Sequence, residues 1–197
     1  LLVGAWLLGG AVLLLGLAGL LRPWTLAAIT ALLALVGRWR RFPRLADAAA
    51  PLAGTALLLP VALAPPFFYD ALVYHLAAPQ AWLRTGRLTD MPEVHQWRLP
   101  GLLQPLYLWA LAWSDDRLCK LVNAGIAFLA AGQLGTWAGK RWGRSAGTWA
   151  AVLFLSAPLV GVNLWACAND IPAGFFAFLA LTLWIARREG AGRSHAV

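Results

Sequence analysis

The segment LPGLLQPLYLWALAW, residues 99–113, decides how the chain is arranged. It is apolar, but it is shorter than the roughly 20 residues with which a helix crosses a bilayer, and Pro100 and Pro105 interrupt it. If the segment crosses a membrane, every later loop changes sides. If it lies along the surface, the residues around it form one long loop, and the charge pattern of the whole chain distinguishes these two arrangements.

Composition indicates an integral membrane protein. Of the 197 residues, 61% are hydrophobic and 12% are charged, against about 25% charged in soluble domains. Six apolar runs could form spanning helices, near residues 1–21, 24–37, 48–64, 118–138, 146–163 and 171–186. We therefore predict an all-α protein, a polytopic membrane helix bundle in which residues 1–197 are part of a single transmembrane domain. The first residue is not Met and the last follows a basic stretch, so we expect the N-terminal part of a longer protein.

Basic residues of short loops stay on the cytoplasmic side of a membrane. The chain has three basic clusters, namely Arg38, Arg40, Arg41 and Arg44; Lys140, Arg141 and Arg144; and Arg187, Arg188 and Arg193. All three face the cytoplasm only if residues 99–113 lie in the interface. This arrangement leaves residues 65–116 as one external loop on the periplasmic or extracellular side. The net charge of +8 is then a topology signal, and it implies no nucleic-acid partner.

The external loop contains the stretch FFYDALVYHLAAPQAWLRTG, residues 67–86, in which an aspartate, a tyrosine and a histidine fall within six positions. Residues 71–83 predict a helix lying in the interface, with Gln80, Arg84 and Arg87 on one polar face. Pro79 should kink this helix or start a second turn, and Gly86 should end it. Cys119 and Cys167 lie in apolar runs and receive no role.

The run PPFFYDALVYHLAAPQAWLRTGRL, the later segment LPGLLQPLYLWALAW and the helix opening DDRLCKLVNAGIAF together resemble bacterial members of the GT-C superfamily. These are multi-spanning glycosyltransferases related to protein O-mannosyltransferases and to the aminoarabinose transferases of lipid A. The resemblance covers about residues 65–186, and its most specific part is D-x-x-x-Y-H-L-x-x-P, residues 70–79. It implies a multi-pass protein of the bacterial plasma (inner) membrane that moves a sugar from a polyprenyl-phosphate carrier to an acceptor at the outer face.

The resemblance also implies two site acids. Asp70 occupies the place of the acid that follows a membrane helix, and Asp170 in ACANDIPAGFF resembles a second acidic position at the start of a later helix. Displacing a lipid phosphate with inversion needs a base on the acceptor hydroxyl, which a carboxylate supplies, and cations for the departing phosphate. The candidate catalytic residues are Asp70 and Asp170, and the candidate substrate-binding residues are Tyr74, His75, Arg84, Arg87 and Arg98. Since family members take important phosphate contacts from later loops, residues 1–197 alone should be inactive.

Each candidate also has a structural explanation. Asp70 could be a helix N-cap, and Asp170 could cap a helix with Pro172 in its first turn. His75 could be a structural hydrogen-bonding residue and Tyr74 an interface anchor. The polar stretch TDMPEVHQ brings together the potential cation ligands Asp90, Glu93 and His95, although a solvated loop is favoured there. No cofactor is assigned, and the need for a divalent metal ion stays open.

Other classes of membrane protein also fit part of this pattern. A transporter or flippase would carry charges inside the membrane or paired broken helices, and a non-catalytic subunit of cell-envelope assembly would not need the long loop. An oligosaccharide polymerase or ligase would use similar polyprenyl-linked sugars. The sequence does not identify the sugar, nor whether the acceptor is a protein, a lipid or a glycan.

Overall fold

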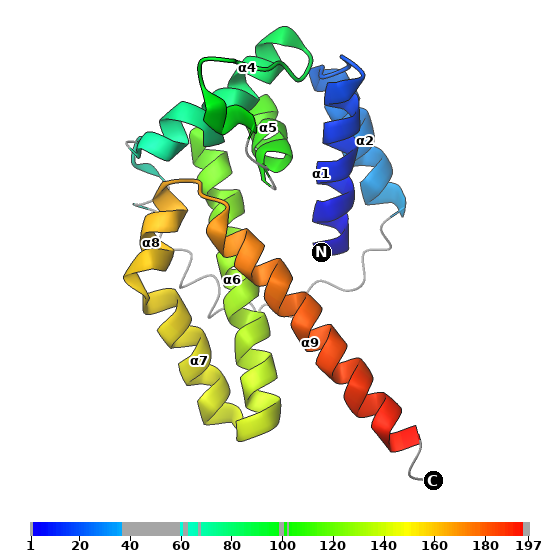
Figure 1. The fold of residues 1–197 in the computed structure, drawn as a ribbon, viewed down its shortest axis with the longest axis vertical. Helices are drawn as coiled ribbons and strands as arrows, with labels where there is room; N and C mark the ends of the chain where they lie inside the picture. The colour runs from blue at the N-terminus through cyan, green and yellow to red at the C-terminus, as the bar shows by residue number, and fades with distance from the viewer. Residues whose placement is uncertain are drawn as a thin grey trace. The chain divides into compact units, whose positions relative to one another are not determined.

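The computed structural model describes residues 2–36, 60, 63–66, 68–98, 101 and 103–194 (Figure 1). Every regular element within these residues is a helix and none is a strand, which confirms the all-α prediction. The chain divides into two compact units, one of Leu1–Ala124 with Leu164–Asn169 and the other of Gly125–Asn163 with Asp170–Val197. The predicted span near 48–64 and the basic cluster at 38–44 lie outside the described residues, apart from residues 60, 63 and 64.

The first unit begins with α1 (Leu2–Leu17) and α2 (Pro23–Val36), which lie side by side (Figure 1). α1 has 16 residues, fewer than the run predicted near 1–21, and α2 has 14, the length of the run predicted near 24–37. Both are shorter than the roughly 20 residues of a comfortable span. The first helix ends early because the chain turns at Gly19, whose φ of 70° lies in the left-handed region that glycine adopts at little cost. The turn closes on the Thr25 hydroxyl, which accepts a hydrogen bond from the Arg22 N–H over 3.1 Å.

The predicted interfacial helix over 71–83 is divided into two elements. A π-helical turn, η1 (Ala71–His75), is followed by α4 (Ala77–Thr85). Pro79 lies in the first turn of α4, where its missing N–H leaves no helical hydrogen bond unmade, so the prediction that it starts a second turn is confirmed. The predicted stop at Gly86 is confirmed as well, because this residue has a φ of 74° and its N–H donates to the carbonyl of Trp82.

Residues 104–113 form the next α-helix of the first unit. A short 3-10 turn, η2 (His95–Arg98), precedes α5 (Gln104–Trp113), which has Pro105 in its first turn. At about 1.5 Å per residue, ten residues are too short to cross a bilayer. α5 contacts α1, α2 and α4 and contributes Leu108 to a core with Val12, Leu21 and Leu26. Its orientation relative to a membrane stays a prediction, as do the sidedness of the loop and of the basic clusters.

The helix α6 (Asp116–Trp142) starts in the first unit and continues into the second. The second unit also contains α7 (Arg144–Ser156), α8 (Pro158–Trp165) except its last two residues, and α9 (Asp170–Ser194). Within the described residues, α6 and the Asp170–Arg188 part of α9 are long and apolar enough to cross a membrane. They match the runs predicted near 118–138 and 171–186. The membrane character of the chain thus has structural support, while the six-helix polytopic bundle stays a prediction.

The span predicted near 146–163 is broken. α7 and α8 meet at an angle of 57°, and they provide a third candidate span only if the bent pair is counted as one. The break has a local cause, because Pro158 disfavours helical geometry at the residue before it, and Ala157 is extended with a ψ of 125°. The apolar run predicted near 146–163 therefore forms two helices, and its crossing of a membrane stays a prediction.

Candidate functional site

Asp70 is the acid on which the predicted mechanism depends. Its backbone is already helical, with φ −62° and ψ −39°, and its side chain caps no backbone N–H. The side chain is half-buried, and within the described residues no hydrogen bond or ion pair reaches its carboxylate. The alternative explanation of Asp70 as an N-cap is therefore wrong, and no contact in the described part of the chain accounts for an aspartate at this position.

The π-helical turn directly after Asp70 fixes the orientation of Tyr74 and His75. The turn is closed by the Leu76 N–H, which donates to the Ala71 carbonyl five residues earlier over 3.0 Å. His75 is buried, and its ring centroid lies 4.1 Å from that of Tyr74. The inserted residue of a π-turn rotates the following side chains relative to an α-helix, and such turns occur frequently at functional sites.

Tyr74 lines a small aromatic cavity of about 110 Å³ together with Trp82 and Trp97. Hydrogen bonds hold both indoles, because Trp82 Nε1 donates to the Thr89 carbonyl and Trp97 Nε1 to the Val73 carbonyl, each over 2.9 Å. The two rings meet edge to face at 6.4 Å. The cavity is smaller than the roughly 300–1,000 Å³ of typical ligand pockets, so it would take only part of a ligand.

The Gln104 side chain supplies the polar wall of this aromatic cavity. It is 5% exposed, and its Oε1 is buried without a hydrogen-bond donor in the described residues. A buried acceptor without a partner is costly, so a ligand hydroxyl would satisfy it. Sequence reasoning missed Gln104, because an amide among apolar residues carries no local signal of its burial.

Two of the three predicted arginines lie away from the aromatic cavity. Arg84 is in the last turn of α4 and Arg87 follows Gly86, and both are exposed and absent from the cavity wall. The side chain of Arg98 lies outside the described residues, although its backbone is in η2. Asp90, Glu93 and His95 are exposed, and the described part of the chain has no group of three His, Cys, Asp or Glu that could hold a metal ion.

Asp170 is the first residue of α9 in the second unit, and Pro172 in the same turn is fully buried. The exposed Asp170 lines a cavity of about 420 Å³. Apart from Asp170 and Asn163, its lining residues are apolar or glycine. Asn163 on α8 is the second polar lining residue. Asp70 belongs to the first unit and Asp170 to the second, so their shared side of a membrane stays a prediction.

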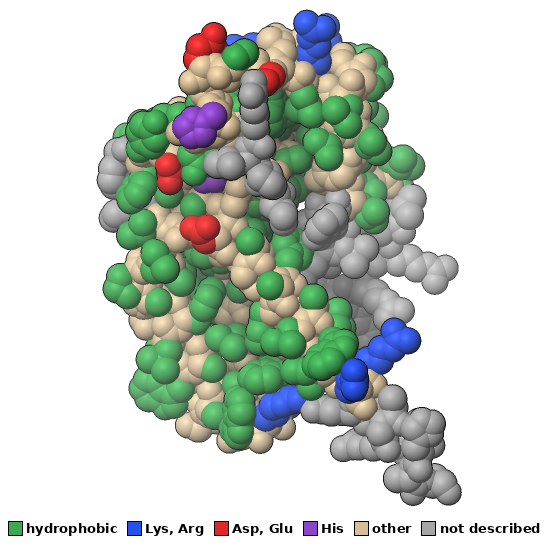
Figure 2. All heavy atoms as spheres, viewed as in Figure 1, with side chains coloured by type: hydrophobic (Ala, Val, Ile, Leu, Met, Phe, Trp, Pro, Cys, Tyr) green, Lys and Arg blue, Asp and Glu red, His purple; other side chains and the backbone are tan. Residues whose placement is uncertain are grey.

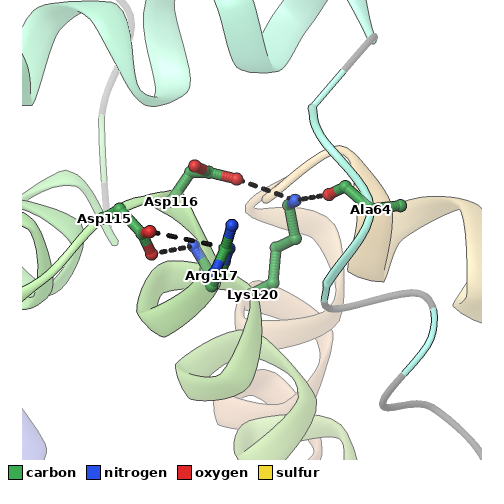
Figure 3. A network of polar contacts seen from close by, with 5 residues as sticks. All are labelled: Ala64, Asp115, Asp116, Arg117 and Lys120. Atoms are coloured by element: carbon green, nitrogen blue, oxygen red, sulfur yellow. Dashed lines mark hydrogen bonds and ion pairs between the residues drawn. The ribbon is translucent and has the colours of Figure 1, made fainter.

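The structure also shows an ion pair that sequence reasoning missed. Lys120 is 2% exposed, its Nζ lies 2.8 Å from Asp116 Oδ2, and it donates a hydrogen bond to the Ala64 carbonyl (Figure 3). Ala64 immediately precedes the two prolines ahead of the Asp70 motif. Lys120 therefore ties the start of α6 to the segment that leads into Asp70. The available signal was the spacing of four between Asp116 and Lys120, although that spacing does not predict burial.

Cys167 lies between α8 and α9 and is fully buried, with a left-handed φ of 47° that is uncommon for a residue other than glycine. Burial raises the pKa of the Cys167 thiol to about 12, and the nearby Lys120 lowers it only in part. The thiol is therefore protonated at neutral pH and poorly reactive.

No protein-family model, curated protein or solved structure matches this chain. The resemblance to GT-C enzymes therefore rests on the quoted residues alone.

Proposed function

We propose that this chain belongs to a GT-C type membrane glycosyltransferase, which moves a hexosyl or pentosyl group from a polyprenyl-phosphate carrier to an acceptor at the outer face of a membrane. The observation that supports the proposal most is the π-helical turn of Ala71–His75, which falls inside the motif that carries the resemblance. Because π-turns are rare and concentrate at functional sites, this geometry favours a functional role for the motif over a purely structural one.

Asp70 is the proposed general base. Its carboxylate removes the proton from an acceptor hydroxyl as that oxygen attacks the anomeric carbon of the donor. The bond from that carbon to the phosphate oxygen breaks, and polyprenyl phosphate leaves with the electron pair. The absence of a cap or ion pair to Asp70 within the described residues supports this role, because its carboxylate is available to accept a proton.

The aromatic cavity, whose lining includes Tyr74 four residues after Asp70, supports sugar binding. The rings of Tyr74, Trp82 and Trp97 offer flat apolar surfaces for the C–H face of a sugar, and Gln104 Oε1 offers an acceptor to a sugar hydroxyl. The second unit has its own apolar cavity of about 420 Å³, with the Asp170 carboxylate at its wall. Asp170 is the proposed companion acid.

The test uses the protein expressed from its complete coding region and reconstituted in proteoliposomes. The donor is a radiolabelled monosaccharide on polyprenyl phosphate, and the acceptors are the membrane extract and protein fraction of the source cells. Transfer of label from the carrier to either fraction supports the proposal. Label that stays on the carrier with every acceptor fraction contradicts it. If an oligosaccharide carrier serves as donor and the monosaccharide carrier does not, the protein is a ligase or polymerase instead.

A flippase is a second candidate, and the break between α7 and α8 favours it. Discontinuous helices line the substrate sites of many transporters, and Asn163 on the short α8 faces the apolar cavity of this unit. In the same proteoliposomes, movement of a fluorescent polyprenyl-phosphate lipid between leaflets, without any acceptor, identifies the flippase. Transfer without movement identifies the transferase.

A further inference from the structure

An open groove lies at the turn between α6 and α7, wholly within the second unit. Its volume is about 470 Å³, and its lining residues are Gly132, Gly135, Thr136, Gly139, Lys140, Arg144, Gly147 and Thr148. We name it the α6–α7 groove. Lysine and arginine side chains are visible in the lower part of the face drawn in Figure 2.

Close packing of the two helices produces this groove. A Cβ on Gly147 would lie 2.5 Å from the carbonyl oxygen of Gly135 and 3.0 Å from the Cα of Gly139, so the two backbones touch here. Along this contact the groove walls consist of glycine backbone and short threonine side chains. A flexible ligand can therefore approach the helix backbones without meeting large side chains.

Two cations stand at the groove, on either side of the turn. Lys140 lies in the last turn of α6 and Arg144 is the first residue of α7. Both side chains are exposed and line the groove. Neither forms an ion pair with an acid in the part of the chain that the structure describes. Two unpaired cations at one groove attract an anion that can bridge them, and a phosphate group has the oxygens to do so.

Aromatic residues around the turn indicate where this anion comes from. Trp142 and Trp149 are 65% and 61% exposed, and the Arg141 guanidinium lies 4.7 Å from the centre of the Trp137 ring. Exposed indoles next to basic residues are typical of the headgroup region of a membrane. One wall of the groove is α6, which is long and apolar enough to cross a bilayer.

We propose that the α6–α7 groove binds the phosphate headgroup of an anionic phospholipid. Lys140 and Arg144 pair with the phosphate oxygens, the glycine and threonine walls admit the glycerol and the start of the acyl chains, and Trp142 and Trp149 lie among neighbouring headgroups. Basic pockets between membrane helices are known to bind anionic lipid headgroups in this way. This site is independent of the proposed glycosyl transfer.

The test measures lipid binding to the purified protein, expressed from its complete coding region, in mixed micelles. Phosphatidylglycerol is titrated against phosphatidylcholine, and the thermal unfolding midpoint reports binding, since a ligand of the folded state raises it. The test variant is K140Q/R144Q. Because each basic residue near an anionic lipid surface is worth about fivefold, we expect this variant to need about 25-fold more phosphatidylglycerol for the same stabilisation.

Two further variants separate the groove from general surface charge. R187Q/R188Q removes the same charge from the exposed end of α9, outside the groove, and should lose much less of the response than K140Q/R144Q. K140R/R144K keeps both charges in the groove and should keep the response of the unmodified protein. If K140Q/R144Q fails to fold, the single variants K140Q and R144Q should each lose about fivefold.

Three results would overturn the proposal. They are equal losses in the groove variant and in R187Q/R188Q, equal stabilisation by phosphatidylglycerol and phosphatidylcholine, and full stabilisation by inorganic phosphate alone. The last result would make the groove a site for a soluble anion.

Discussion

Replacing Lys120 with methionine should destabilise the protein by about 3 kcal/mol, because it leaves the Asp116 carboxylate without its cation. Breaking a buried ion pair on one side costs about 3–5 kcal/mol. The lower end applies here, since the Asp116 side chain is 26% exposed and water still reaches it, while Lys120 is 2% exposed. The double variant Asp116→Asn with Lys120→Met removes both charges. Its remaining cost of about 1 kcal/mol comes from the Ala64 carbonyl, which loses its donor.

The assay is equilibrium unfolding in mild detergent with urea, followed by tryptophan fluorescence. Arg117→Met is the matched control, because Arg117 pairs with Asp115 over 3.6 Å while its side chain is 61% exposed, and such exposed pairs contribute about 0–1 kcal/mol. The account requires the double variant to be about 2 kcal/mol more stable than Lys120→Met. Equal stability of these two variants would refute the ion-pair reasoning, as would a loss below 1 kcal/mol for Lys120→Met.

Three more substitutions or treatments test the described contacts. Gly147→Ala should destabilise the protein by about 1–3 kcal/mol, because the new Cβ would lie 2.5 Å from the Gly135 carbonyl oxygen. Gly132→Ala is the control and should be neutral or stabilising, because nothing lies within 4 Å of its Cβ. Equal melting midpoints of the two variants would contradict the close contact between the helices. Gly86→Ala should cost about 1–2 kcal/mol, because alanine must adopt a φ of 74°, and an unchanged urea midpoint would exclude that conformation. Cys167 should resist maleimide at pH 7 until the protein unfolds, because the thiol is buried and its raised pKa of about 12 keeps it protonated. Rapid labelling of the folded protein would show instead that the thiol is accessible.

Local signals predicted the element types and several boundaries. The apolar composition predicted helices, Gly86 ended α4 as expected, and Pro105 falls in the first turn of α5. These features depend on a residue's own backbone preferences, which a sequence displays directly.

Features that depend on tertiary contacts were not predictable. The π-turn at Ala71–His75 replaces an α-helical turn, and both of its end residues are buried, so packing decides between the two hydrogen-bond patterns. The burial of Lys120 was not predictable either, because the sequence does not reveal that the Ala64 carbonyl comes to lie beside it. The break before Pro158 did carry a local signal, but the apolar run across it outweighed that signal.

The most direct test of the proposed mechanism compares Asp70→Asn with Asp90→Asn in the transfer assay with polyprenyl-phosphate sugar. Asparagine keeps the size of the side chain but cannot accept the proton, and Asp90 is an exposed aspartate of the same loop. The account predicts that Asp70→Asn folds and binds the carrier but transfers sugar about 10²–10⁴-fold more slowly, while Asp90→Asn keeps the unmodified rate. Transfer by Asp70→Asn at the unmodified rate would contradict the assignment of Asp70 as the base.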